Sequence, residues 1–405
     1  MKMNKELVKG SFILLIAFGV YNFLNFAFQS SMARLLTIAE FGVLSVLFNI
    51  IYVFSGFSDS IQITITKYAA NEKDDGKVKN ILKRALKKSF LISLILFLVY
   101  VLLAFLIAYL TKIDYFLILL VGLLIFIFFL SPITRGLLQG KRKFDSLGIN
   151  MFFESIIKLF LAIVLVMAGW KVYGAIAGTL IGCFVAFGLS FFHLKDVIKA
   201  KETLTSTKEI YQYGAPSFFI VITILIFYGF DVFLAKIFFP SEIAGKYAIA
   251  SLMAKIIFFG TQPISRAMFP ISAEKNIKKD KSKNIFMNAF LLVCVGIAAV
   301  LAFFYFFPDF VIEIFSGKII PEAANILFYL GIATSLLSIT NLILLYKLSL
   351  GKTKGCVHLL VFAIIEISLV AVYLGYFHAN LFQYSIALIA ASAIFLWGVI
   401  FLLNE

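Results

Sequence analysis

A few ionisable side chains interrupt the long apolar runs of this 405-residue sequence. Asp231 lies within one run, Lys255 within the next, and Glu366 within a later one. A charged residue at the centre of a membrane helix costs roughly 2.5 to 3.5 kcal/mol, so such residues usually face a cavity or a partner. We therefore take these three residues as candidates for binding an ion or a charged substrate.

Polar side chains also follow three of the apolar runs at helical spacing. Residues three or four positions apart share one face of a helix, so each set predicts a polar stripe. The stripes are Asn22, Asn25 and Gln29; Ser45, Asn49, Tyr52, Gly56 and Asp59; and Ser251, Lys255, Gln262 and Arg266. A stripe of this kind either lines a hydrated cavity or joins helices by hydrogen bonds. We expect cavity lining for the second and third stripes and leave both readings open for the first.

Possible ion pairs complicate the roles of these charges. Asp231 could exchange a proton or hold a cation, or it could form a structural ion pair with Lys255, and the sequence leaves both open. Glu154 and Lys158 are four residues apart, so we expect an internal salt bridge between them. If Lys158 points into a cavity instead, it would provide a cationic lining suited to a phosphate group. Glu366 has no evident partner and is a further proton or cation site candidate.

Motifs that would indicate catalysis are absent from the sequence. It contains no GxxxxGK[ST], HExxH, CxxC or GxSxG pattern. Its three cysteines, Cys183, Cys294 and Cys356, lack metal-ligand spacing and are expected to be packing residues. We therefore expect no enzyme activity, no metal and no cofactor.

The composition identifies the solvent around the helices that carry these residues. With 62% hydrophobic and 14% charged residues and a mean hydropathy of +1.03, the chain has too little polar surface for a water-soluble globule. The apolar runs are about 20 residues long, which suits membrane helices. We predict an all-α membrane protein with about twelve transmembrane helices. Their centres are expected near residues 22, 53, 100, 125, 157, 182, 226, 256, 296, 335, 366 and 391.

Basic residues account for the formal net charge of +15 and predict the orientation. They gather in alternate short links, which the positive-inside rule places in the cytoplasm. The basic groups are residues 2–9, 67–88, 135–143, 195–208, 266–283 and 347–354. Both termini are then cytoplasmic, and we expect a location in the plasma membrane. Charge in such links faces anionic membrane lipids, and no nucleic-acid motif accompanies it.

An internal repeat divides the chain into two halves. Ala33-Arg34 aligns with Ala235-Lys236, and Gly42 aligns with Gly245. Glu72-Lys73 and the basic turn after Gly140 have counterparts in the same order, at Glu274-Lys275 and after Gly351. The polar link from residue 194 to 213 joins the halves. We predict an N-terminal six-helix bundle over residues 1–205 and a C-terminal one over residues 206–405.

Several short motifs resemble a known family. They are Ala33-Arg34-Leu35-Leu36, Glu40-Phe41-Gly42, Gly136-Leu137-Leu138-Gln139-Gly140, Tyr213-Gly214-Ala215-Pro216, and Asp231 followed by Gly245-Lys246-Tyr247 and Phe269-Pro270. Together they resemble the polysaccharide biosynthesis, or O-antigen flippase, family of the multidrug, oligosaccharidyl-lipid and polysaccharide exporter superfamily. The resemblance implies two six-helix bundles related by a pseudo-two-fold axis along the membrane normal. It carries over only Arg34 and Asp231, which fall in matching motifs.

The resemblance also implies a function. Members of that family move polyprenyl-pyrophosphate-linked oligosaccharides from the cytoplasmic to the outer leaflet. We expect such a flippase, monomeric and coupled to protons or sodium, with these cavity residues: Arg34, Lys158, Lys255, Asn25 and Gln262. The expected ion-coupling residues are Asp231, Asp59 and Glu366. The alternative is a proton- or sodium-coupled multidrug antiporter of the same fold. A membrane-embedded glycan polymerase would need a large outer loop, and this chain has none. A scaffold protein of an assembly complex would stay functional when these charges are mutated.

Overall fold

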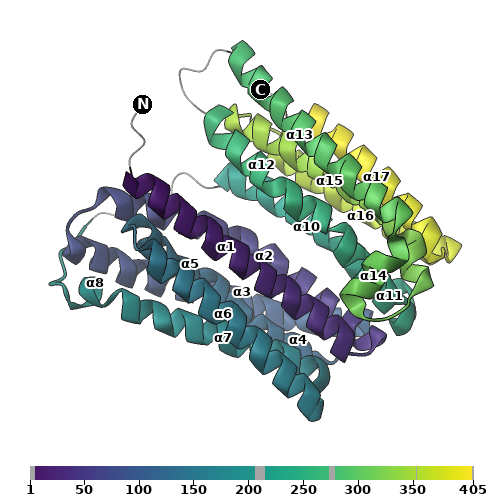
Figure 1. Ribbon diagram of the computed structural model, residues 1–405, viewed down its shortest axis with the longest axis horizontal. Helices are drawn as coiled ribbons and strands as arrows, with labels where there is room; N and C mark the ends of the chain where they lie inside the picture. Colours follow the sequence, from purple (N-terminus) through teal and green to yellow (C-terminus); the bar gives the residue numbers. More distant parts are fainter. Residues whose placement is uncertain (1–4, 206–214, 273–278, 353, 404–405) are drawn as a thin grey trace. The chain divides into compact units, whose positions relative to one another are not determined.

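The computed structural model describes residues 5–205, 215–272, 279–352 and 354–403 (Figure 1). These ranges form helices joined by short links, and they contain no strand. The all-α prediction is therefore confirmed for the described ranges.

Nine helical runs within these ranges are long and apolar enough to cross a membrane. One of them, residues 144–193, contains two helices interrupted at Gly169, whose φ of 92° breaks the run. A bilayer core about 30 Å thick needs about 20 apolar residues per helix. The chain is therefore a multi-pass membrane protein. The nine runs do not establish the predicted twelve spans in two bundles, which stay a prediction.

The contacts within the chain divide it into two compact units. The first comprises Met1–Glu40 and Ile50–Gly214, and the second comprises Phe41–Asn49 and Ala215–Glu405. The predicted domain boundary at residues 205 and 206 adjoins residues 206–214, which lie outside the described ranges, and it stays a prediction. Each unit is described by itself below.

The first unit contains the helices from α1 to α8. Helix α2 begins with a capping box, in which the Thr37 side chain accepts from the Glu40 backbone and the Glu40 carboxylate accepts from the Thr37 backbone. The helices are α1 (Lys5–Leu35), α2 (Ile38–Asn71), α3 (Asp75–Thr111), α4 (Tyr115–Gly122), α5 (Leu124–Gly140), α6 (Phe144–Leu165), the π-helical turn η1 (Val166–Trp170), α7 (Lys171–His193) and α8 (Lys195–Lys199).

Glycines at a spacing of four allow α7 to lie very close to α6. The three are Gly174, Gly178 and Gly182. A Cβ added at Gly182 would lie only 2.9 Å from the Glu154 carbonyl oxygen and the Lys158 backbone nitrogen. Small residues permit this kind of backbone approach between membrane helices. The glycine face of α7 thus packs against the part of α6 that carries Glu154 and Lys158.

The Gly136-to-Gly140 motif has the same role between α5 and α2. A Cβ at Gly136 would lie 2.9 Å from the Ile65 Cβ, and one at Gly140 would lie 2.6 Å from the Ala69 Cβ. Close packing of α2 against α5 therefore explains why this motif needs two glycines.

The stretch after α8 is fastened to the start of α3. Lys79 donates to the Ala200 carbonyl oxygen at 2.8 Å, and the Asn80 amide donates to the Glu202 carboxylate at 2.7 Å. Apolar residues of α3 are buried beneath, against Val197 of α8. Much of the basic group at residues 67–88 therefore lies on the first part of α3, which also has a packed apolar side.

The second unit contains the helices from α10 to α17. Helix α15 lies in its middle and packs against α11, α12, α13, α14 and α17. Helices α11 and α12 form one run that is interrupted at Lys255. The helices are α10 (Ala215–Phe238), α11 (Ser241–Ala254), α12 (Ile256–Ser272), α13 (Lys279–Phe306), α14 (Pro308–Ser316), α15 (Pro321–Ser349), α16 (Cys356–Phe377) and α17 (Leu381–Leu402).

A lysine of α15 closes the C-terminal end of α17. The Lys347 ammonium donates to the carbonyl oxygens of Val399 at 3.0 Å, of Leu403 at 2.7 Å, and of Ile400. The last carbonyls of a helix have no partner within the helix and need one elsewhere. Lys347 supplies that partner from a neighbouring helix.

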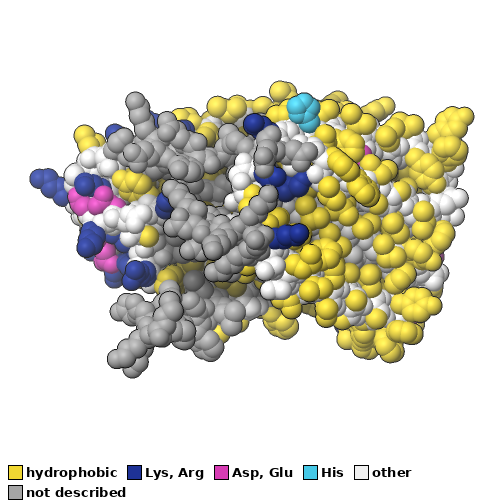
Figure 2. Space-filling view, turned by 90° about the horizontal axis from the view of Figure 1, so that it is seen from above, with side chains coloured by type: hydrophobic (Ala, Val, Ile, Leu, Met, Phe, Trp, Pro, Cys, Tyr) yellow, Lys and Arg dark blue, Asp and Glu magenta, His cyan; other side chains and the backbone are white. Residues whose placement is uncertain are grey.

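The surface agrees with lipid as the solvent. Large apolar side chains are exposed along α3 and α16, including Leu102, Phe105, Leu369 and Val372. Figure 2 shows apolar side chains over much of the face it displays, while the Lys and Arg side chains lie on the left and in the middle of the view. Exposed apolar surface on this scale marks contact with a membrane or a partner rather than with water.

Candidate functional site

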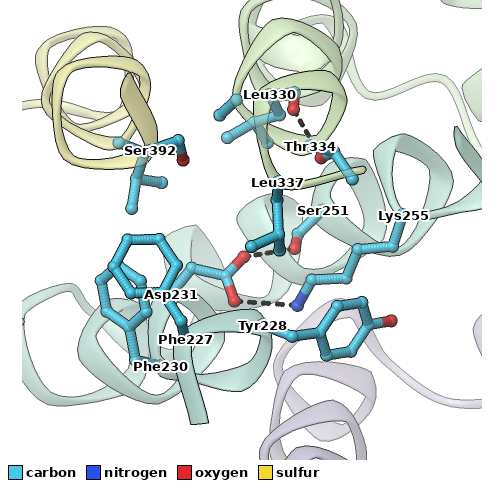
Figure 3. A pocket seen from close by; sticks show the side chains of 12 residues that line it. Phe227, Tyr228, Phe230, Asp231, Ser251, Lys255, Leu330, Thr334, Leu337 and Ser392 are labelled. Carbon is cyan, nitrogen blue, oxygen red and sulfur yellow. Dashed lines mark hydrogen bonds and ion pairs between the residues drawn. The ribbon is translucent and has the colours of Figure 1, made fainter. Parts of the chain in front are cut away.

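Each unit contains a buried cluster of charged and polar side chains. In the second unit the cluster forms around Asp231 of α10 (Figure 3). The Lys255 ammonium lies 2.8 Å from one Asp231 carboxylate oxygen. The hydroxyls of Tyr247 and Ser251 donate to the other oxygen at 2.9 and 2.6 Å. All three contacts are charge-assisted hydrogen bonds, which are stronger than neutral ones.

The spacing of the donors explains why one helix supplies all three. Tyr247 and Ser251 of α11 and its C-terminal cap residue Lys255 follow each other at intervals of four, so they lie on the side of this run that meets α10. Helix α17 adds a fourth contact, because the Tyr384 hydroxyl donates to the Asp231 carbonyl oxygen at 2.7 Å. The Asp231 cluster therefore joins three helices of the unit.

Lys255 has two further neighbours. Its ammonium lies 4.4 Å from the centre of the Tyr228 ring and 3.4 Å from the Asn49 amide oxygen. Asn49 belongs to the short part of α2 that is grouped with the second unit. The ammonium is thus held by a carboxylate, an aromatic face and an amide.

A small pocket opens beside this ion pair. Its volume is about 30 Å³, and α10, α15 and α17 supply aromatic and hydroxyl side chains to it. These include Phe227, Phe230, Thr334 and Ser392. This volume is far below the roughly 300 to 1,000 Å³ of typical ligand pockets and is enough for an ion or one or two waters. In this conformation the pocket has no room for an oligosaccharide or a drug-sized molecule.

In the first unit the cluster forms around Glu154 of α6. Its carboxylate pairs with the Arg135 guanidinium of α5 and accepts from the Tyr21 hydroxyl of α1 at 2.9 Å. Arg135 also donates to the Asn150 amide oxygen at 2.9 Å, and Asn150 donates to the Ala186 carbonyl of α7. This Glu154 cluster therefore joins four helices.

Lys158 lies one turn further along α6 and is bound differently. Its ammonium donates to the Asn25 amide oxygen and lies 4.7 Å from the centre of the Phe28 ring. The residue is only 8% exposed, and no carboxylate of the described residues lies within ion-pair distance of it. Lys158 is thus a buried cation held by an amide and an aromatic ring.

This arrangement corrects the expected salt bridge between Glu154 and Lys158. Glu154 pairs with Arg135, because α5 brings a guanidinium to the same carboxylate. A guanidinium offers a planar fork that suits a carboxylate better than an ammonium does. Glu154 and Lys158 do lie one turn apart on the same helix, as their i, i+4 spacing predicts. That spacing could not reveal a competing cation from another helix.

Arg135 itself was predicted as part of a basic link and lies inside α5 instead. Its side chain is only 14% exposed. Apolar residues continue after it at Leu137 and Leu138, and this was the signal that could have placed it within a helix. Tyr21, Asn150 and Tyr384 were also missed, because their role depends on tertiary contacts.

The remaining candidates lie elsewhere. Arg34, in the last turn of α1, and Asp59, on α2, are both exposed. Gln262 on α12 is half-buried, and Glu366 on α16 is buried. The structure therefore joins Lys158 to Asn25 and Asp231 to Lys255, while neither Gln262 nor Glu366 forms a hydrogen bond with these pairs. The side chain of Arg266 is not among the described ones. No group of three metal-ligating side chains occurs in the described part of the chain.

Solved structures with a similar fold are transporters. An inward-facing multidrug resistance MATE family transporter of the MOP superfamily matches 96% of this chain and 97% of its own, with a TM-score of 0.76 and 15% identity. A MOP superfamily transporter from Pyrococcus furiosus, whose binding pocket is described as reversed in polarity, matches 98% and 94%, with a TM-score of 0.65 and 16% identity. At such identities the likeness shows the fold. No curated protein matches the chain.

The sequence of the chain also matches a family. The family described as "Polysaccharide biosynthesis protein" matches residues 31–325, which is well over half of the chain. The motifs around Arg34, Gly136 and Asp231, which carry the resemblance, all lie within this range. The chain therefore belongs to the polysaccharide biosynthesis protein family and has the fold of the MOP superfamily transporters.

Proposed function

We propose that the chain is a flippase that moves a polyprenyl-pyrophosphate-linked oligosaccharide from the cytoplasmic to the outer leaflet by alternating access. The family match and the transporter fold support a transport role. The observation that carries the choice of substrate is Lys158, a buried ammonium with no carboxylate partner among the described residues.

Lys158 has the properties of an anion site. An ammonium has three N–H donors, and one of them is used by the Asn25 amide oxygen. A buried charge is costly unless it is paired, so this site favours an anionic ligand such as a pyrophosphate. Pyrophosphate cannot cross hydrocarbon unaided, and a cation inside the membrane lowers that barrier.

Lys255 would act on the same group in a second step. In this structure it is neutralised by Asp231, at 2.8 Å. A proton or a sodium ion bound to Asp231 would release the Lys255 ammonium for the pyrophosphate. This exchange gives a physical route by which ion binding and substrate binding are coupled.

The remaining residue assignments in the proposed mechanism rest on the sequence patterns. We assign Arg34, Asn25 and Gln262 to the substrate path, and Asp59 and Glu366 to ion coupling together with Asp231. The proposed protein is a monomer in the plasma membrane with both termini in the cytoplasm. It acts on membrane lipids without enzyme chemistry or a cofactor.

The test uses purified protein in liposomes and a fluorescent short-chain polyprenyl-pyrophosphate sugar, with an impermeant quencher reporting the leaflet. Lys158→Gln should slow flipping by about tenfold or more, because a charge-assisted contact is worth roughly 1.5 to 3 kcal/mol. Lys158→Arg should retain most of the rate. The matched control is Lys87→Gln, which removes an exposed lysine of the same unit. Wild-type flipping by a folded Lys158→Gln protein would refute the assignment.

A second candidate is a small-molecule antiporter, and one observation favours it. The pocket in the second unit places Phe227, Tyr228 and Phe230 around the acidic Asp231, a combination that suits an organic cation. Efflux of a cationic dye driven by a proton or sodium gradient, and lost in Asp231→Asn, would support this alternative. Absence of dye efflux together with lipid flipping would exclude it.

A further inference from the structure

Glu366 differs from every other buried acid described above. It is 5% exposed, and neither of its carboxylate oxygens has a hydrogen-bond partner among the described residues. Asp231 and Glu154, in contrast, each have a cation and at least one hydroxyl donor. Glu366 is therefore a buried carboxyl group that no residue in the described part of the chain neutralises.

The helices around Glu366 supply no counter-charge. Helix α16 packs against α10 and α17. The titratable or charged side chains described on those helices are Tyr228, Asp231, Lys236 and Tyr384. Lys255 binds Asp231, Lys236 donates to the Ser241 hydroxyl, and Tyr384 donates to the Asp231 carbonyl oxygen. The Tyr228 ring faces the Lys255 ammonium.

The other side of α16 faces an apolar medium. Ile364, Ile365 and Leu369, which flank Glu366 in sequence, are each at least half exposed on a membrane helix. An ionised carboxylate without partners costs several kcal/mol in such surroundings. A metal cation would need several oxygen ligands at once, and no atom of the described residues forms a hydrogen bond with this carboxyl group.

We propose that Glu366 is a proton-binding site, so that the coupling ion of the proposed transporter is a proton carried by this carboxyl group. The role of this proton as the coupling ion rests on the proposed function, whereas the proton site itself rests on the structure alone. In the conformation described here, Glu366 holds the proton as a neutral acid while Lys255 neutralises Asp231.

A neutral acid in an apolar site has a characteristic reaction with a hydrophobic carbodiimide. The carboxyl oxygen bonds to the central carbon of dicyclohexylcarbodiimide, and the acid's proton moves to one nitrogen, which breaks the C=N double bond to a single bond. The O-acylisourea then rearranges by transfer of the acyl group from oxygen to nitrogen, giving a stable N-acylurea. No atom is lost, so the protein gains the mass of one whole reagent.

The experiment is labelling of the full-length protein in lipid nanodiscs, followed by mass spectrometry of the intact chain and its peptides. We expect one adduct at neutral pH, on Glu366, with less labelling as the pH is raised. Glu366→Gln should abolish the adduct, and Glu366→Asp should retain it. Asp231, which Lys255 neutralises, and the exposed Glu313 should remain unlabelled. The matched control Glu313→Gln should label like the wild type.

Three results would overturn the proton site. They are no adduct at Glu366, labelling of Asp231 in its place, and protection by sodium but not by choline at constant pH, which would indicate a metal-ion site. Flipping in liposomes separates this proposal from the previous one. A labelled Glu366 without any lipid flipping would refute only the flippase. Flipping with an unlabelled Glu366 would refute only the proton site.

Discussion

The two buried clusters use similar parts with different balances of charge. The Asp231 cluster of the second unit matches one carboxylate with one ammonium and adds two hydroxyl donors. The Glu154 cluster also contains an ion pair, but a second cation, Lys158, lies one turn away on the same helix. One cluster is therefore balanced, and the other has a surplus positive charge.

The difference shows which residues stabilise the protein and which are available for a ligand. A matched buried pair gives little net stability compared with apolar packing, but it becomes costly when one partner is removed. Removal of the surplus cation Lys158, in contrast, leaves no buried carboxylate without its partner. Stability and transport should therefore respond to different residues in the two units.

The largest effect is expected for Glu154→Gln. It leaves two cations, Arg135 and Lys158, without a nearby carboxylate, and we expect a loss at the upper end of the range of about 3 to 5 kcal/mol. The free energy of unfolding in detergent micelles measures it. Asp145→Asn, at an exposed position at the start of α6, is the control and should change little. Equal stability of both variants would show that the cluster contributes nothing.

Asp231→Asn should come next, with a loss of about 3 kcal/mol, because it leaves only Lys255 unpaired. Lys255→Met should be similarly costly. The double variant should recover part of the loss, and a double-mutant cycle should give a coupling energy of about 0.5 to 3 kcal/mol. Additive effects would mean that the pair is not formed in the folded protein.

Gly182→Ala tests the packing that holds the first cluster together. The new Cβ would meet the backbone of α6 at 2.9 Å, beside Glu154 and Lys158, and we expect a loss of about 1 to 3 kcal/mol. Gly188→Ala on the same helix is the matched control, because nothing lies within 4 Å of its added Cβ. Since alanine favours helix more than glycine does, the control should be neutral or slightly stabilising.

Lys158→Met is the sharpest test of the imbalance. It removes the surplus cation and leaves no carboxylate unpaired, so we expect the free energy of unfolding to stay within about 1 kcal/mol of the wild type. Flipping should nevertheless be lost. If Lys158→Met destabilises the protein as much as Lys255→Met does, the distinction between the two clusters fails.

An ion pair outside the membrane provides the reference with the smallest effect. The hydrogen bond from Lys83, and then that from Asn80, lower the pKa of Glu202. The stabilising effect of a carboxylate with a lowered pKa is present above its ordinary pKa, about 4.3, and is lost as the pH falls through the folded value. The difference in melting temperature between wild type and Glu202→Gln should therefore be small at neutral pH and vanish in acid. A difference that grows in acid would contradict this.

Much of this structure could be predicted from the sequence because the patterns that predict it lie within single helices or short stretches of chain. Apolar content and run length were enough to predict an all-α membrane protein, and the spacing of Ser251 and Lys255 placed them on one face. The order of the motifs was enough to identify the family. Features that involve one helix or one stretch of chain could be predicted.

Contacts between helices were beyond such patterns. The pairing of Arg135 with Glu154 depends on how α5 packs, and the Tyr384 contact joins positions 153 residues apart. Asp231 and Lys255 were recognised as possible partners, although their pairing and their role in coupling were equally open from the sequence. The assignment of Arg34, Asp59 and Gln262 to function stays a prediction.

The cap that Lys347 places on α17 has a consequence for biosynthesis. Helix α15 is made before α17, so the lysine is already in the membrane when the last carbonyls of the later helix emerge. An unpaired carbonyl in lipid costs several kcal/mol, and a waiting donor removes that cost as the chain is inserted. The helix that provides the hydrogen-bond donor is thus synthesised before the helix whose carbonyl oxygens accept from it.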